Sequence, residues 1–67
     1  MVQAARAELV RCQGCGIVVA VHQPPGVAFH MARGRAAGER ERMTITVDRA
    51  LVHECVRSLD GTWRVVC

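Results

Sequence analysis

The sequence has no lysine and no tyrosine, and its 67 residues include only one phenylalanine and one tryptophan. The hydrophobic interior therefore has to be built from valine, leucine, isoleucine and methionine. A chain of this length buries only about 60% of the surface that its unfolded form exposes. Domains of this size often depend on disulfides, a bound metal or a partner chain. We therefore expect a single small domain over residues 1–67 that needs such support.

The sequence also lacks a long hydrophobic segment. The longest apolar run, residues 17–21, is far too short to cross a bilayer. The amino-terminal segment MVQAARAELVRC has no apolar region of the length that a secretory signal needs. We therefore expect a cytoplasmic protein that does not bind membranes. Because thiols are kept reduced in the cytoplasm, this location favours metal binding over disulfide formation for the four cysteines.

Positive charge is carried by arginine alone, and nine arginines against six acidic residues give a formal net charge of +3. A GC-rich coding sequence is our first explanation for this bias, but arginine also supplies forked donors that suit phosphate. The tripeptide Arg33-Gly34-Arg35 resembles the minor-groove-reading core of AT-hooks, with Ala36 in place of the usual proline. Arg33 and Arg35 are therefore the candidate nucleic-acid-binding residues, although an exposed, solvated loop over 33–41 is the favoured interpretation.

Strand and turn patterns cover most of the chain. The expected strands are 17–22, 27–32, 43–47 and 62–67. The proline-rich turn at 23–26 separates the first two, which can then pair antiparallel. Residues 2–10 suit a helix, and a strand over 8–11 that leads into the cysteines is the alternative.

Residues 48–61 fit two different structures. The apolar residues Leu51, Val52, Cys55, Val56 and Leu59 form one stripe at helical spacing. Asp48 can cap the start of such a helix, and Gly61 can follow its end. Alternatively, Asp60-Gly61 is a two-residue turn signal between two strands. We favour the helix over 49–60, because apolar and polar residues alternate poorly there. The expected fold class is α+β, with antiparallel strands and one helix.

The stretch RCQGCGIVV places Cys12 and Cys15 three positions apart, with a glycine after each. This spacing puts two thiolates on one tight turn, from which they can occupy adjacent corners of a tetrahedral zinc site. Glycine tolerates the positive φ angles that such a turn requires. The apolar segment, cysteine turn and second apolar segment over 9–19 resemble the first knuckle of a zinc ribbon. The second C-x2-C pair that a ribbon normally has is missing.

Two further ligands have to come from elsewhere in the chain. Cys55 and Cys67 are the economical choice. The expected zinc site is thus Cys12, Cys15, Cys55 and Cys67. His53 is the alternate ligand: a helix would turn it away from Cys55, whereas a strand would place both on one face. A thioredoxin-like redox role is disfavoured, because it needs the first cysteine at a helix start.

The sequence shows no carboxylate pair, phosphate-binding loop or catalytic constellation, so we do not expect an enzyme. The leading hypothesis is a small zinc-stabilised interaction module that binds another protein, such as an accessory or regulatory subunit. One alternative is a zinc-ribbon-like nucleic-acid-binding protein that uses Arg33 and Arg35. Another is a metal-free structural component of a larger assembly, in which neighbouring chains supply the missing hydrophobic burial.

Overall fold

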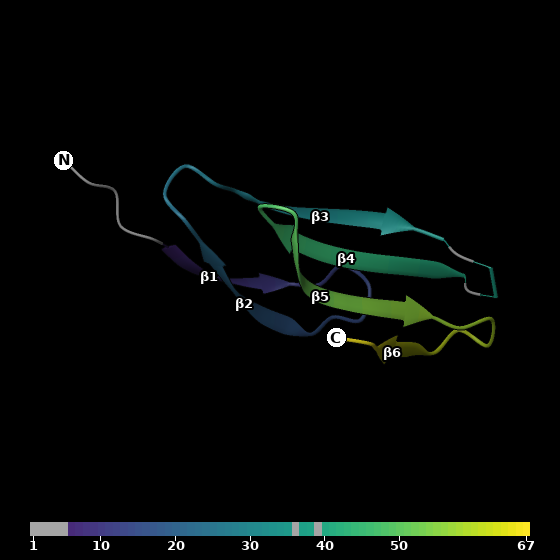
Figure 1. Cartoon of the computed structure of the whole chain (residues 1–67). Helices are drawn as coiled ribbons and strands as arrows, with labels where there is room; N and C mark the ends of the chain where they lie inside the picture. The colour runs from purple at the N-terminus through teal and green to yellow at the C-terminus, as the bar shows by residue number, and fades with distance from the viewer. Residues whose placement is uncertain (1–5, 36, 39) are drawn as a thin grey trace.

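Two antiparallel β-sheets make up the computed structural model, which describes residues 6–35, 37–38 and 40–67 (Figure 1). The six strands are β1 (Arg6–Arg11), β2 (Val18–Gln23), β3 (Phe29–Gly34), β4 (Glu41–Val47), β5 (Ala50–Arg57) and β6 (Trp63–Val65). The hairpin sheet pairs β1 with β2, and the four-stranded sheet has the order β3-β4-β5-β6. These residues form no helix, so the fold is all-β and the expected α+β class is wrong. Accordingly, no helix in this part of the chain is long and apolar enough to cross a membrane.

The tight turn between β4 and β5 explains why the expected helix does not form. Val47 pairs with Ala50, which leaves Asp48 and Arg49 as the two turn residues. Their φ angles are 49° and 68°, in the left-handed region that a type I′ hairpin turn requires. Asp48, the expected helix cap, is therefore a turn residue, and the chain returns along β4 as β5. The helix expected over 49–60 is wrong.

Apolar residues on both faces of β5 account for the helix-like stripe in the sequence. Cys55 pairs with Met43 and is fully buried on the face that meets the hairpin sheet. Val56 points to the opposite face, between Arg42 and Arg64 of the neighbouring strands, and is only 2% exposed. A strand that buries side chains on both faces loses its alternation, so its pattern resembles that of a buried helix.

Most of the expected strands are present in the structure. The segments expected at 17–22, 43–47 and 62–67 correspond to β2, β4 and β6, within a few residues at each end. The alternative strand over 8–11 is confirmed as part of β1. The helix expected over 2–10 is therefore wrong for residues 6–10, and residues 2–5 lie outside the described residues.

The segment expected as a strand over 27–32 lies mostly in β3, but it has a different partner. β3 pairs with β4, whereas β2 pairs with β1, so the expected pairing with 17–22 is wrong. Pro24 and Pro25 lack the N–H groups that a continuing ladder needs, and the chain crosses to the other sheet there. The segment that connects β3 to β4 covers 35–40, because residues 33–34 belong to β3 and residue 41 begins β4.

Two small clusters pack the hairpin sheet against the four-stranded sheet. The apolar cluster consists of Val10, Val21, Ile45 and Val47. The sulfur cluster consists of Cys12, Met43 and Cys55, with Cys15 and Trp63 packed against it. Fully burying one branched aliphatic side chain contributes about 1.5–3 kcal/mol. The apolar cluster alone is therefore a modest core, and sulfur-bearing side chains complete the interior.

Candidate metal centre

The loop between β1 and β2 fixes the first two candidate ligands. The Cys12 N–H donates to the Ile17 carbonyl at 2.8 Å, and the Gly16 N–H donates to the Cys12 carbonyl at 3.1 Å. Gly16 has a φ of 80°, which a residue with a Cβ adopts only with strain. The Gly14 N–H donates to the Cys12 Sγ at 3.4 Å. The loop is thus closed by its own backbone, with amides directed toward sulfur as in a metal-binding knuckle.

Gly14 also lets this loop lie directly on the four-stranded sheet. A Cβ at position 14 would come within 2.6 Å of the Met43 Cγ and 2.7 Å of the Trp63 ring. Any larger residue would therefore have to displace one of these side chains. This close approach brings the thiols of the loop down to the face of β5.

The other two candidate ligands come from β5. His53 and Cys55 are two residues apart on this strand, so their side chains point to the same face. They pair with Ile45 and Met43 of β4, and both are buried, with His53 4% exposed and Cys55 fully enclosed. The strand conformation of 50–57 is therefore what makes His53 a neighbour of Cys55.

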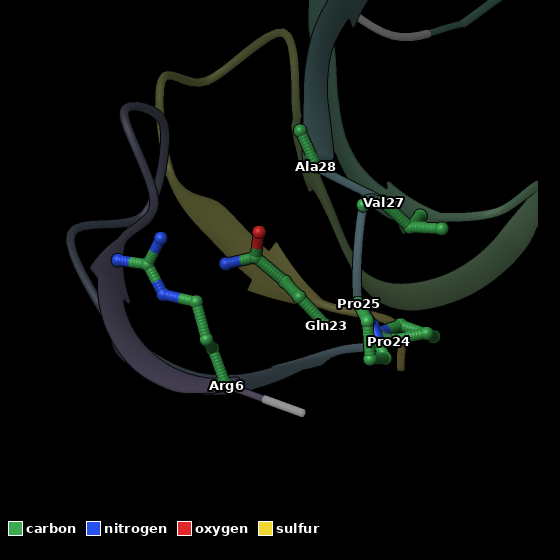
Figure 2. Close-up of a pocket in the computed structure, with 7 residues that line it drawn as sticks. Arg6, Gln23, Pro24, Pro25, Val27 and Ala28 are labelled. Atoms are coloured by element: carbon green, nitrogen blue, oxygen red, sulfur yellow. The ribbon is translucent and has the colours of Figure 1, made fainter. Parts of the chain in front are cut away.

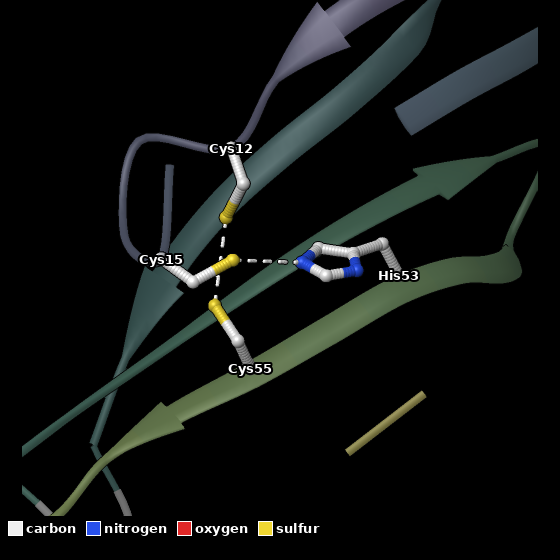
Figure 3. Close-up of side chains that lie close together, drawn as sticks. All are labelled: Cys12, Cys15, His53 and Cys55. Carbon is white, nitrogen blue, oxygen red and sulfur yellow. Dashed lines mark hydrogen bonds between the residues drawn. The ribbon is translucent and has the colours of Figure 1, made fainter. Parts of the chain in front are cut away.

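The quartet Cys12, Cys15, His53 and Cys55 brings four donor atoms within 4.8 Å of one another (Figure 3). The Cys12 and Cys55 sulfurs are 3.5 Å apart, and the Cys15 sulfur lies 3.4 Å from the His53 Nε2. Zinc–sulfur bonds of about 2.3 Å in a tetrahedron would place two sulfurs about 3.8 Å apart. The donor types and their separations therefore fit one tetrahedral metal ion, in agreement with a zinc-ribbon-like knuckle.

The Cys12 and Cys55 thiols have pKa values shifted in opposite directions. Burial alone would raise the pKa of Cys12. Hydrogen bonds from the backbone of Gly14 and Cys15 and with the neighbouring thiols outweigh burial and lower this pKa below its ordinary value, to about 7. Burial and the hydrogen bond with Cys12 raise the pKa of Cys55 to about 12. Their shared hydrogen bond thus favours the thiolate form at Cys12 and the proton at Cys55. A cation bound by both sulfurs would replace that proton.

Cys67, expected as the fourth ligand, is exposed and lies outside the quartet. Continuing the pairing of Cys55 with Val65 by two residues would place Cys67 opposite His53. Instead, the N–H groups of Val66 and Cys67 both donate to the Glu54 carbonyl, at 2.8 and 3.2 Å. This two-against-one arrangement is a β-bulge. Cys67 is therefore aligned with Glu54, whose side chain faces away from His53.

His53, expected as the alternate ligand, is thus the residue that joins the three cysteines in the structure. The sequence signal for this arrangement is the H-x-C spacing at 53–55, which brings two ligands together on a strand but not on a helix. Arg33 and Arg35, the candidate nucleic-acid contacts, are both exposed at the end of β3 and in the segment after it. Arg33 forms an ion pair with Glu41 at 3.2 Å.

Surface hollows lie away from the quartet. One of about 440 Å³ is lined by Arg6, Gln23, Pro24, Pro25, Gly26, Val27 and Ala28 (Figure 2). Arg6 and Gln23 provide its polar side chains, so it contains neither a nucleophile nor an acid–base pair. Another, of about 450 Å³, is lined by Arg35, Arg40, Glu41 and Leu59.

No protein-family model, curated protein or solved structure matches this chain.

Proposed function

We propose that this protein is a small, zinc-stabilised, non-catalytic interaction module that binds another protein. The observation that carries the proposal is the quartet of three buried residues and the half-buried Cys15, in which two candidate ligands from the hairpin loop meet two from β5. Four protein ligands fill a tetrahedral site and leave no position for water or substrate. Structural zinc sites have such closed ligand sets, whereas catalytic zinc sites keep one position open.

The donor chemistry supports zinc over the other common ions. Calcium and magnesium take oxygen ligands, and the quartet offers three sulfurs and one imidazole nitrogen. Soft thiolates in a tetrahedral arrangement are typical of zinc and of iron–sulfur centres, and iron–sulfur clusters are normally held by four cysteines. A single histidine with three cysteines is one of the standard structural zinc sets.

A metal in this position would join the two sheets. The ligands come from the loop between β1 and β2 and from β5, so one ion would fasten the hairpin sheet to the four-stranded sheet. Zinc binding is worth roughly 10–16 kcal/mol in small zinc-dependent domains at neutral pH. The net stability of a typical domain is only about 5–15 kcal/mol. Metal binding would therefore decide whether this chain folds.

The outer face of the hairpin sheet supports a protein partner. Leu9 and Val18, diagonal neighbours on that face, are 76% and 48% exposed. Ala7 and Ala20 are exposed on the same face. Adjacent exposed apolar side chains of this kind are typical of protein-binding surfaces. In addition, β1 and β2 pair only with each other within the described chain, and unpaired strand edges readily accept a strand from another chain.

The proposal is tested in two stages. Purified protein should carry about one zinc per chain, and a strong chelator should remove both the metal and the folded structure. A metal-free protein that unfolds cooperatively and does not respond to chelator would contradict the proposal.

The partner surface is tested with the double variant Leu9→Glu/Val18→Glu, which leaves the quartet intact. It should keep its zinc but lose a protein that the unmodified chain retains in affinity capture from its native host. The matched control is Thr44→Glu/Thr46→Glu, which places two carboxylates on the outer face of the four-stranded sheet. Capture of the same proteins by all three forms would contradict binding through the hairpin sheet.

A further inference from the structure

One end of the four-stranded sheet extends beyond the hairpin sheet (Figure 1). Six of the nine arginines belong to the segments that strand pairing brings together toward that end. We call the segments 33–42 and 57–64, of which the structure describes all residues except 36 and 39, the arginine end. Its arginines are Arg33, Arg35, Arg40, Arg42, Arg57 and Arg64. Strand pairing brings the two segments together, since Glu41 pairs with Arg57 and the Arg40 N–H donates to the Arg57 carbonyl at 2.8 Å.

The arginine end carries all of the formal net charge of the protein. Its sequence contains three acidic residues, Glu39, Glu41 and Asp60, against the six arginines. The rest of the chain has three arginines and three acidic residues, which cancel. The molecule is elongated, with extents of 51 × 19 × 15 Å, and the strand ends that carry these arginines lie toward one end of it (Figure 1). Such an asymmetric positive charge attracts polyanions.

Three of these arginines are held in internal ion pairs. The Glu41 carboxylate bridges Arg33 at 3.2 Å and Arg57 at 3.1 Å. Arg42 pairs with Glu54 at 3.2 Å. Each of these three guanidinium groups therefore already has a carboxylate partner within the chain.

The other three arginines remain available to a ligand. Arg35, Arg40 and Arg64 are exposed, and no carboxylate among the described residues lies within ion-pair distance of them. The Asp60 carboxylate is satisfied by Thr62, which donates to it from its backbone N–H at 3.0 Å and its hydroxyl at 2.7 Å. Arg35 and Arg40 also flank the hollow of about 450 Å³ described above.

We propose that the arginine end binds the phosphate backbone of double-stranded nucleic acid through Arg35, Arg40 and Arg64, without reading its sequence. This activity goes beyond protein binding by the hairpin sheet and uses a separate surface. Arg33 forms an ion pair with Glu41, so it is not among the proposed phosphate-binding residues. These residues therefore differ from the pair Arg33 and Arg35 that the sequence Arg33-Gly34-Arg35 suggests. Release of counterions from the duplex supplies the binding energy.

The position of the aromatic residues favours a duplex over a single strand. Single-stranded nucleic acids bind by stacking bases on exposed aromatic rings. Trp63 packs on the cysteine loop at Gly14, and Phe29 packs against the apolar cluster at the other end of β3. Leu59 is exposed at the arginine end, but one leucine buries too little surface to anchor a protein at a lipid interface.

The experiment measures binding to a labelled DNA duplex, an RNA duplex of the same sequence, a single strand and anionic vesicles over a series of salt concentrations. The zinc-loaded full chain should bind both duplexes, and three phosphate contacts predict a slope of about −2.7 for log K against log salt. Arg35→Gln/Arg40→Gln should make that slope shallower by about 1.8. Arg6→Gln/Arg49→Gln removes the same charge from outside the arginine end and should leave the slope unchanged.

Zinc content measured in the same samples separates this proposal from the metal proposal. Loss of duplex binding with full zinc content supports the assignment to the arginine end. The assignment is overturned by equal losses in the two double variants, by binding to vesicles without binding to duplexes, or by no duplex binding at low salt. A preference for DNA or RNA would identify the natural duplex, and either preference supports the proposal.

Discussion

The same two sheets are joined in two places by different kinds of contact. In the apolar cluster, valines of the hairpin sheet pack on Ile45 and Val47 of β4. In the quartet, thiols from the hairpin loop meet His53 and Cys55 of β5. The apolar contact depends on volume and tolerates similar shapes, whereas metal ligation depends on the identity and direction of each donor atom. The fold is therefore expected to respond very differently to substitutions in the two regions.

The largest effect is expected when a ligand of the quartet is removed. Cys12→Ser or Cys55→Ser should abolish stoichiometric zinc binding and cooperative folding, because a bound zinc ion would supply more free energy than such a small core retains. Circular dichroism and zinc analysis of the purified variants provide the measurement. Cys67→Ser is the matched control and should behave like the unmodified protein. If all three variants kept their zinc and their fold, the quartet would not be the metal site.

Replacing His53 tests the composition of the quartet. His53→Ala leaves three thiolates and an open position. Loss of a residue that only hydrogen-bonds to a metal ligand typically lowers metal affinity about 10–100-fold, so loss of the ligand itself should lower zinc affinity by more than this. His53→Cys restores a fourth donor and should recover most of that affinity. Competition titration with a zinc indicator measures both variants, and His22→Ala, on the exposed face of β2, should be silent. Equal affinities for His53→Ala and His22→Ala would exclude His53 as a ligand.

In the apolar cluster, the effect should follow the volume that is lost. Ile45 is fully buried, so Ile45→Ala should lower the free energy of unfolding of the zinc-loaded protein by about 2–5 kcal/mol. Ile45→Val should cost about 0.5–1.5 kcal/mol. Urea unfolding with excess zinc gives both values. A cost for Ile45→Ala as small as that for Ile45→Val would mean that this cluster contributes little to the fold.

A smaller effect is expected at the glycines of the cysteine loop. Gly14→Ala forces a Cβ into Met43 and Trp63, and overpacking of this kind costs about 1–3 kcal/mol. Gly16→Ala meets no neighbouring atom, and its cost comes from the positive φ angle alone, at about 1–2 kcal/mol. Gly14→Ala should also weaken zinc binding more, because it displaces the loop from β5. Competition titration with a zinc indicator measures both affinities. A lower zinc affinity for Gly16→Ala than for Gly14→Ala would contradict the close packing at position 14.

How much of the site can be predicted from sequence depends on how local each contact is. Cys12 and Cys15 are recognisable because one tight turn brings them together, and their spacing alone defines that turn. Cys55 is predicted as a ligand only because it is one of the two remaining cysteines. Whether His53 lies beside it depends on the conformation of residues 50–57. Turns of type I′ are usually marked by Asn-Gly, and here Asp48 and Arg49 adopt the left-handed conformation without that signal.

The strands themselves were more predictable than their partners and their ends. β-branched residues mark β2 and β4, because side chains of this kind fit a pleated sheet. The pairing of β3 with β4 and the bulge at Val66 and Cys67 depend on backbone hydrogen bonds between distant segments. A shift of one residue moves a side chain to the other face of a sheet, which is why Cys67 could not be placed from the sequence.

The most direct test of the metal site is a cobalt titration of the metal-free chain, followed by displacement with zinc. A tetrahedral site of three thiolates and one imidazole predicts one cobalt per chain, visible ligand-field bands and thiolate-to-cobalt charge-transfer absorption. Zinc should remove this spectrum stoichiometrically, and His53→Cys should shift the ligand-field bands toward those of a four-thiolate site. A folded chain that binds no cobalt, or that binds it without the charge-transfer absorption of thiolates, would contradict the proposed centre.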